Sequence, residues 1–229
     1  MTSHPLDRPV WGMLTGRQAD LAVVAGDAVR IDPAYGPFAA ARDAGEAALA
    51  ALAAAVATHP GEVWLVEPDE WPAPPGTRVI RTAPLVQMVA DDPAPMTAGD
   101  EEAVLLGAAD ADQMTALALA TEPGPWGDKT RIYGDFFGFR RDGQLLAMAG
   151  QRMLPAPGFD EVSAVCTWPA YQGQGLAARL IRRVMAGMTA RGATPFLHSY
   201  AGNARAIGLY ESLGFRVRRE MVVTVLGLA

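Results

Sequence analysis

Residues 171–180 read "YQGQGLAARL", with two glycines one residue apart and a helix-like run after them. A strand is predicted to end near Thr167, so this stretch joins that strand to a helix starting at about Gly175. The first amides of a helix have no partner within it and lie at the positive end of its dipole. Such an end binds phosphate readily, and glycine lets the phosphate approach the backbone. The stretch therefore predicts either an anion-binding loop or a simple strand-to-helix turn.

Two common phosphate loops fit this stretch poorly. A P-loop needs a lysine directly after its last glycine, and no lysine follows here. The dinucleotide-binding pattern G-x-G-x-x-A is matched by Gly173, Gly175 and Ala178, but it also needs an acidic residue about 20 positions further on. No Asp or Glu lies between Glu161 and Glu211, and too few residues remain for the second half of a dinucleotide fold. A nicotinamide-binding oxidoreductase is therefore the weaker hypothesis.

The second part of the chain predicts a mixed α/β fold. Its hydrophobic periodicity gives the order β-α-β-β-β-α-β-α-β, with a tight hairpin turn at Asp142–Gly143. The expected elements are strand 102–108, helix 110–124, hairpin 131–154, strand 160–168, helix 175–192, strand 195–200, helix 203–213 and strand 215–226. We therefore expect one sheet flanked by helices over residues 98–229.

The first 97 residues are expected to form an N-terminal α/β lobe. Residues 38–60 are rich in alanine and leucine and predict a helix, and residues 61–68 predict a strand. Residues 77–90 predict one interrupted strand or two, because Pro84 cannot donate to a strand ladder. Residues 91–100 carry two prolines and are the best linker candidate, so we divide the chain into 1–97 and 98–229.

Composition argues against several classes of protein. A net charge of −6 argues against general nucleic-acid binding, and no apolar run approaches the roughly 18 residues that would span a bilayer. One cysteine and three scattered histidines make a disulfide framework or a metal site unexpected. The first residues lack a basic region followed by an apolar core, as a signal peptide would have. We therefore expect a cytoplasmic protein with no membrane or nucleic-acid partner, and the sequence does not indicate an oligomeric state.

A second signature follows the glycine loop. Residues 203–215 read "NARAIGLYESLGF", and the gap before them holds a predicted helix and strand. The loop fits [QR]-x-x-G-x-[GA] from Gln172 to Ala177, with Pro169 three residues before it. The second stretch fits N-x-x-A-x-x-L-Y-x-x-x-G-F at Asn203, Ala206, Leu209, Tyr210, Gly214 and Phe215. Together they resemble the two signatures of the GCN5-related N-acetyltransferases, the GNAT superfamily, and most closely its FR47-like branch.

The resemblance covers about residues 100–229 and implies a mixed, mostly antiparallel sheet flanked by helices. Residues 1–97 lack both signatures, and a degenerate GNAT-like half is one interpretation of them. The resemblance also implies acetyl-CoA as co-substrate, with its pyrophosphate held by backbone amides of Gln172, Gly173, Gln174, Gly175, Leu176 and Ala177. Backbone amides at Val165, Cys166 and Thr167 would bind the pantetheine arm and polarise the thioester carbonyl, as in an oxyanion hole.

Asn203 and Tyr210 lie seven residues apart, about two turns along one helix face. Asn203 is expected to cap the helix, and the resemblance implies that it also approaches the cofactor arm. The matching tyrosine of the family protonates the departing CoA thiolate. Because a phenol with a pKa of about 10 holds its proton at neutral pH, Tyr210 can be this acid. Packing, with the hydroxyl at the rim of the cleft, is the alternative role for Tyr210.

The general base is less clearly marked. Glu161 starts the strand before the glycine loop, where some members of the family carry a base. A strand-edge carboxylate in water is the alternative for Glu161, and the amine can also lose its proton through water without a dedicated base. Cys166 lies in a predicted strand with no paired histidine, so we expect it to be inert rather than an acyl-enzyme nucleophile. His198 is expected in a strand near the cleft.

Charge is uneven along the chain. Residues 161–229 hold eight arginines against three acids, which indicates an anionic ligand or a solvated basic helix face. The resemblance implies that Arg179, Arg182 and Arg183 reach the 3′-phosphate of CoA, although a solvated side chain is the simpler role for each. The first 97 residues hold six arginines against twelve acids, which weakly favours a cationic acceptor such as a polyamine, an amino sugar or a basic peptide; solubility explains this charge equally well.

The functional hypothesis is an acetyl-CoA-dependent N-acetyltransferase that transfers an acetyl group directly to a primary amine. The acceptor is a small molecule or a peptide of unspecified identity, and the acyl chain length is open. The alternative is a catalytically silent acyl-CoA-binding sensor or interaction protein built on the same fold.

Overall fold

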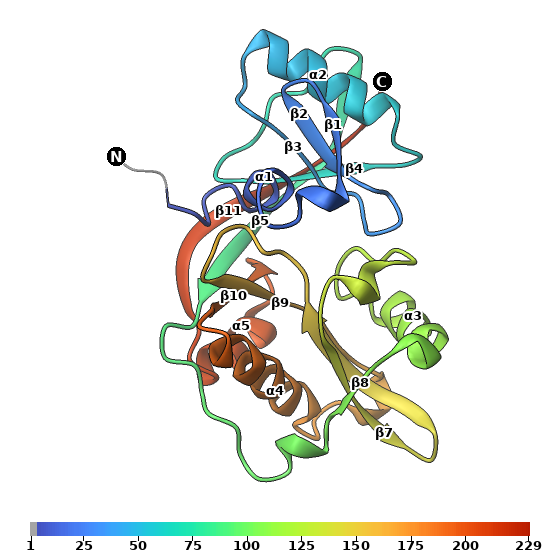
Figure 1. Cartoon of the computed structure of the whole chain (residues 1–229), viewed down its shortest axis with the longest axis vertical. Helices are drawn as coiled ribbons and strands as arrows, with labels where there is room; N and C mark the ends of the chain where they lie inside the picture. Colours follow the sequence, from blue (N-terminus) through green and yellow to red (C-terminus); the bar gives the residue numbers. More distant parts are fainter. Residues whose placement is uncertain (1–3) are drawn as a thin grey trace.

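The computed structural model describes residues 4–229 and contains two β-sheets within that range (Figure 1). The small sheet has the order β1-β2-β3, from β1 (Ala22–Ala25), β2 (Ala28–Ile31) and β3 (Ala39–Ala41). The large sheet has the order β4-β11-β5-β10-β9-β8-β7-β6. Its strands are β4 (Val63–Glu67), β5 (Thr77–Val89), β6 (Val104–Leu105), β7 (Phe136–Arg141), β8 (Gln144–Gln151), β9 (Phe159–Thr167), β10 (Thr194–Tyr200) and β11 (Arg216–Leu228).

Helices cover both sheets (Figure 1). They are α1 (Pro9–Thr15), α2 (Glu46–Ala57), α3 (Ala111–Thr121), α4 (Leu176–Ala190) and α5 (Ala204–Ser212). Helix α4 packs in one core cluster with Phe137 and Phe139 of β7, whereas α3 packs in another with Phe136. Successive side chains of a strand point to opposite faces, so α3 and α4 cover opposite faces of the large sheet. Helix α2 closes the small sheet and the end of the large sheet beside it.

The predicted order of the second part of the chain is confirmed. From residue 104 the elements run β6, α3, β7, β8, β9, α4, β10, α5 and β11. The β7–β8 hairpin turns at Asp142 and Gly143, whose φ angles of 51° and 80° are the left-handed values that a tight hairpin turn needs. Among the strand pairs described, β9 and β10 are parallel and the others are antiparallel.

The N-terminal helix is shorter than the sequence predicts. Residues 39–41 are not helical but form the buried strand β3, and the helix begins at Glu46. An Asp43 side-chain oxygen accepts a hydrogen bond from the Gly45 amide at 2.8 Å, which turns the chain just before the helix. Pairing with β2 and burial of three alanines thus outweigh the helix propensity of alanine at residues 39–41.

The proline in the predicted interrupted strand is accommodated without a break. Strand β5 runs through Pro84 as one strand of 13 residues. Its neighbour β10 pairs with it only as far as Tyr200 opposite Leu85, and the Pro84 carbonyl accepts a hydrogen bond from Ala201 just beyond that pair. The missing N–H of Pro84 therefore faces the side on which the neighbouring strand has ended.

The division that the sequence suggests at residues 97 and 98 does not separate two sheets. Strand β5, from the first 97 residues, lies between β10 and β11, and β4 pairs with β11 at the edge of the same sheet. The small sheet and α2 do lie together at one end of the molecule (Figure 1). The two parts of the chain therefore interlock in the large sheet, while the proposed boundary stays a prediction.

Candidate active site

The site opens where two neighbouring strands part. Strands β9 and β10 pair at three positions, with Thr194–Phe196 opposite Phe159–Glu161. Further along, the register between β9 and β8 shifts around Ala164, whose φ of 52° is left-handed. A bulge of this kind bends its strand and re-aims the residues after it. Residues 165–167 of β9 therefore have no partner in β10, and a fork forms between the two strands.

A cavity of about 490 Å³ lies at this fork, and we call it the loop hollow. Of the predicted cofactor-binding residues, the structure places all except Gln174 around it, together with the predicted acid Tyr210. Its lining consists of Thr121, Val165, Cys166, Thr167, Tyr171, Gln172, Gly173, Gly175, Leu176, Ala177, Ala178, Asn203, Arg205, Ala206, Leu209 and Tyr210. Strand end, glycine loop and helix α5 thus converge on one cavity.

The glycine loop has a backbone that favours glycine. Gly173 and Gly175 have φ angles of 77° and 75°, which L side chains rarely adopt. A Cβ added at either position would meet no atom within 4 Å, so conformation rather than crowding selects glycine. Helix α4 begins directly after Gly175, and no side chain caps it. Its first amides are therefore available to an anion in the loop hollow.

Arg205 is a residue of the loop hollow that the sequence analysis missed. Its Nη1 lies 3.5 Å from Oε1 of Gln172, so the exposed guanidinium lies beside the glycine loop. Arg205 is the one charged side chain in the lining of this hollow. Its place two residues after Asn203 in the second signature was the signal that could have identified it.

The three arginines of α4 have other partners. Arg182 donates to both oxygens of Asp100, from Nε at 2.6 Å and from Nη2 at 2.9 Å. Arg179 pairs with Glu102 at 2.8 Å, and the Arg183 guanidinium lies 4.1 Å from the Phe137 ring centroid. These arginines fasten the segment before β6 to α4 and cover the sheet, so the structure does not support the expectation that they reach a phosphate.

The N-cap expected at Asn203 is confirmed, and Tyr210 lies on the same helix. Oδ1 of Asn203 accepts a hydrogen bond from the Ala206 amide at 3.1 Å, at the start of α5. The Tyr210 ring packs edge-on against Phe215, with centroids 6.0 Å apart. Burial raises the pKa of the Tyr210 phenol, so the hydroxyl keeps its proton at neutral pH. Direct contact of Asn203 with a cofactor stays a prediction.

Glu161 is not the strand-edge carboxylate in water that we considered. It is fully buried, and Nε and Nη2 of Arg152 each donate to it at 2.8 Å. Nδ1 of His198 lies 2.8 Å from Oε1, and the Met153 amide donates to Oε2. Burial acts to raise the pKa of Glu161, but the Arg152 charge and these hydrogen bonds outweigh it and lower the pKa to about 2.

This geometry argues against Glu161 as a direct base. The carboxylate lines neither the loop hollow nor the second cavity described below. A group with a pKa of about 2 takes up a proton poorly at neutral pH. Its oxygens are engaged by the neighbouring guanidinium, imidazole and backbone amide, so the ion pair serves to fix its partners.

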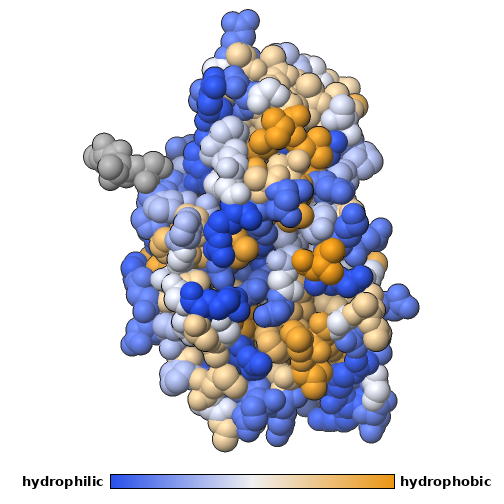
Figure 2. All heavy atoms as spheres, in the orientation of Figure 1, coloured by the Kyte–Doolittle hydropathy of each residue, from blue (hydrophilic) through white to orange (hydrophobic). Residues whose placement is uncertain are grey.

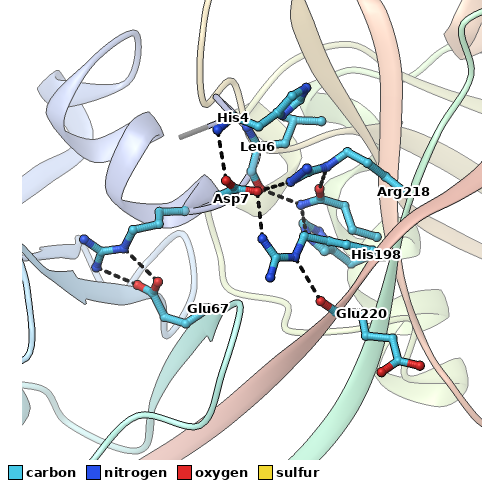
Figure 3. Close-up of polar contacts among 10 residues, drawn as sticks. His4, Leu6, Asp7, Glu67, His198, Arg218 and Glu220 are labelled. Carbon is cyan, nitrogen blue, oxygen red and sulfur yellow. Dashed lines mark hydrogen bonds and ion pairs between the residues drawn. The ribbon is translucent and has the colours of Figure 1, made fainter. Parts of the chain in front are cut away.

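A chain of hydrogen bonds leads from Arg218 to His198 (Figure 3). Nε of Arg218 donates to Oε1 of Gln87 at 2.7 Å, which fixes the orientation of the Gln87 amide. The Nε2 of Gln87 therefore donates to the Leu6 carbonyl at 2.8 Å and to Nε2 of His198 at 3.0 Å. The imidazole consequently carries its hydrogen on Nδ1 and donates it to Glu161. His198 lies beside the cleft as expected, with both ring nitrogens engaged.

A second cavity, of about 280 Å³, adjoins the loop hollow, and we call it the aromatic hollow. The two share Thr121, Val165, Asn203, Ala206 and Tyr210. The remaining lining of the aromatic hollow is Phe38, Trp64, Val66, Leu85, Glu122, Pro123, Gly124, Pro125, Arg152, His198, Ser199, Tyr200 and Val223. Phe38, Trp64, Val66 and Leu85 come from the first 97 residues, where no motif marked them.

Cys166 is a buried free cysteine, and the residues that the structure describes include no candidate metal site. Burial raises the pKa of the Cys166 thiol to about 12, so this side chain stays a thiol at neutral pH, as expected for an inert strand cysteine. Within residues 4–229, no group of three or more His, Cys, Asp or Glu side chains could hold a metal ion. In the same range, every helix is too short or too polar to cross a membrane.

Comparison with known proteins gives consistent matches. The FR47-like protein family model matches residues 136–223. A solved structure from Novosphingobium aromaticivorans, assigned to the GNAT family of acetyltransferases, shares 60% sequence identity with this chain. Its TM-score to this chain is 0.93, and the match covers 99% of this chain and all of that one. The N-alpha-acetyltransferase RimI of Mycobacterium tuberculosis is 34% identical over an alignment of 134 positions, which covers 53% of this chain and 83% of RimI. The ribosomal protein bS18-alanine N-acetyltransferase of Escherichia coli is 33% identical, over 45% of this chain and 74% of that enzyme.

Proposed function

The chain belongs to the GNAT family of acetyltransferases, and we propose that it transfers an acetyl group from acetyl-CoA directly to a primary amine. One observation carries this proposal: the glycine loop, the open edge of β9 and Tyr210 line one cavity. The family membership makes the protein an acyltransferase, and the cavity would supply places for the phosphates, the thioester and the leaving thiolate. A reaction that uses acetyl-CoA fits the cytoplasm, where we expect the protein.

The loop hollow would hold the cofactor by its phosphates. The amides at the start of α4 and the left-handed glycines at 173 and 175 suit the close approach of a pyrophosphate. The exposed Arg205 adds a positive charge beside them. The pantetheine arm would then run along residues 165–167 of β9, which have no partner strand on the side of the fork.

The chemistry needs a polarised carbonyl and a protonated leaving group. The amine nitrogen attacks the thioester carbon, a C–N bond forms, and negative charge gathers on the carbonyl oxygen, where backbone amides of β9 can stabilise it. The C–S bond then breaks, and Tyr210 donates its proton to the thiolate sulfur. Burial raises the pKa of Tyr210, which keeps that proton available at neutral pH. The acceptor ammonium loses one proton through water before attack, because Glu161 and His198 are already engaged. The second proton, lost by the nitrogen once the C–N bond has formed, restores the proton of Tyr210 through water.

The acceptor is proposed at the level of a primary amine on a small molecule or a peptide. Two of the relatives described above are named for N-terminal or alanine acetylation. Those matches cover about half of this chain, and they need not share the wall that residues 38, 64, 66 and 85 build beside Tyr210. The relatives therefore support the reaction more strongly than they support a particular acceptor.

Two measurements test the proposed function. Calorimetry is expected to show acetyl-CoA binding and no comparable NADPH binding; the reverse result would contradict the assignment of the loop hollow. CoA release over a panel of primary amines should then show turnover. Binding of acetyl-CoA without turnover on any amine would favour the silent sensor instead.

Replacing Tyr210 by phenylalanine tests the proposed acid. We expect kcat to fall about 100-fold or more, with acetyl-CoA affinity almost unchanged, because the variant lacks only the proton donor. Tyr35→Phe is a matched control, since Tyr35 packs against Tyr133 away from both hollows. An unchanged kcat in Tyr210→Phe would assign the role of acid to another group.

A further inference from the structure

The aromatic hollow adjoins the loop hollow, and Tyr210 lines both of them. We propose that it selects a small primary amine carrying one apolar group of about the size of a phenyl ring. This inference rests on the proposed acetyl transfer and goes further by giving the substrate class. It depends on the apolar side, the charge and the size of the hollow.

One side of the hollow is apolar and is built on neighbouring strands of the large sheet, whereas polar side chains such as Ser199 and Asn203 line the rest. Trp64 and Val66 are two residues apart on β4, so their side chains point to the same face. Val223 of β11 is directly opposite Val66 in the register, on that same face. The Trp64 ring is fixed from one side by the Arg81 guanidinium, 4.6 Å from the ring centroid. Phe38, whose backbone bridges to Trp64, completes a surface suited to an aromatic or branched aliphatic group.

The charges around the hollow do not suit a polycation. Two of its lining residues carry full charges, Arg152 and Glu122. Arg152 is paired with the buried Glu161 and stacks 5.0 Å from the centroid of Phe38, and the His198 ring is hydrogen-bonded on both sides. Glu122 is exposed and supplies a single negative charge at the cavity. One acid suits one ammonium group, whereas the acidic character of the first 97 residues had suggested a polyamine.

The size of the hollow favours a small ligand. Ligand cavities commonly measure about 300–1,000 Å³, and the aromatic hollow measures about 280 Å³. Most of its apolar wall, at Phe38, Trp64, Val66 and Leu85, lies outside residues 136–223, the segment that the family model matches. The family model therefore does not cover this wall, and a small apolar amine fits a cavity of this size better than a long peptide does.

Binding of three amines to the protein saturated with CoA tests the inference without requiring turnover. The probes are 2-phenylethylamine, ethylamine and spermidine, measured by calorimetry. Because burial of an apolar group of this size contributes strongly to affinity, 2-phenylethylamine is expected to bind about 10- to 100-fold more tightly than either other amine. Equal or tighter binding of ethylamine or spermidine would overturn the proposal, and this comparison uses the unaltered protein.

A pair of tryptophan variants then locates the site. Trp64→Leu should weaken 2-phenylethylamine binding about 10-fold and leave ethylamine binding nearly unchanged. Trp71→Leu is the matched control, because Trp71 packs against the core cluster beneath α2 and lines neither hollow. Thermal melting checks that both variants fold; if Trp64→Leu does not, Phe38→Leu takes its place. Unchanged selectivity in the folded variant would place the apolar group elsewhere and overturn the inference.

Turnover separates this inference from the proposed function. If 2-phenylethylamine binds selectively but no amine releases CoA, the proposed transfer fails and the selectivity of the hollow stands. If spermidine or an alanine-terminated peptide has a higher kcat/KM than 2-phenylethylamine, the acetyl transfer stands and the proposed substrate class is wrong.

Discussion

The two hollows share one rim but are built in different ways. The loop hollow is formed largely by backbone: a strand edge, two left-handed glycines and the first turn of a helix. The aromatic hollow is formed by side chains from segments far apart in the sequence, which meet because β4, β5 and β11 are neighbours in the sheet. Backbone geometry constrains a local pattern of residues, whereas a side-chain wall requires only shape and polarity. The first kind of site therefore leaves a motif in the sequence and the second does not.

The largest expected effect is at the ion pair that supports the aromatic hollow. Arg152→Met leaves the fully buried Glu161 without its main partner, which should cost about 3–5 kcal/mol of unfolding free energy. Urea unfolding measures this change. The control is Arg216→Met, because the exposed pair of Arg216 with Asp91 should contribute at most about 1 kcal/mol. If the free energy of unfolding fell equally in the two variants, burial would not distinguish the Arg152–Glu161 pair from the Arg216–Asp91 pair.

The same ion pair predicts how stability depends on pH. The pKa of Glu161 is lowered from 4.5 to about 2 by folding, so the unfolded chain takes up this proton more readily than the folded one does. The lowered pKa contributes of the order of 3 kcal/mol to the free energy of unfolding, a contribution that is present above pH 4.5 and lost as the pH falls toward 2. Urea unfolding between pH 6 and pH 2.5 should show this loss in the wild type. In Glu161→Gln the dependence should be flatter, whereas Asp91→Asn should follow the wild type.

A glycine substitution should affect the loop hollow alone. Gly175→Ala forces an L side chain into the left-handed conformation, which costs about 1–2 kcal/mol of stability. We expect it also to weaken acetyl-CoA binding and to leave 2-phenylethylamine binding to the folded variant unchanged, as calorimetry would show. Gly61→Ala is the control, because Gly61 does not have a left-handed φ and has open space around it. Unchanged acetyl-CoA affinity in a folded Gly175→Ala protein would contradict the proposed phosphate loop.

The smallest expected effect is at the rim that the two hollows share. Asn203→Ala removes the cap of α5 and should cost about 1 kcal/mol, while Asn203→Ser should retain most of the stability. If Asn203 also contacts the cofactor, both variants should bind acetyl-CoA less tightly in calorimetry. A normal affinity in Asn203→Ser would leave capping as its role.

The contrast between the hollows also explains what the sequence predicted. The glycine loop, the Asn203 cap and the alternation of elements after residue 102 depend on local backbone rules, and the structure confirms each of them. The burial of Glu161 could not be predicted, because its partners Arg152 and His198 come from other segments. Neither could the strand at residues 39–41, where a neighbouring strand outweighs the helix propensity of alanine.

The position of β11 in the sheet has a consequence for how the molecule is completed during synthesis. Strand β4, which carries Trp64 and Val66, is joined to the large sheet through β11, whose residues are made about 150 positions later. A nascent chain that lacks residues 216–228 already contains the glycine loop and α5, but the strand that would place the tryptophan wall is missing. The residues of the proposed donor site thus precede, in the order of synthesis, the strand that completes the proposed acceptor wall.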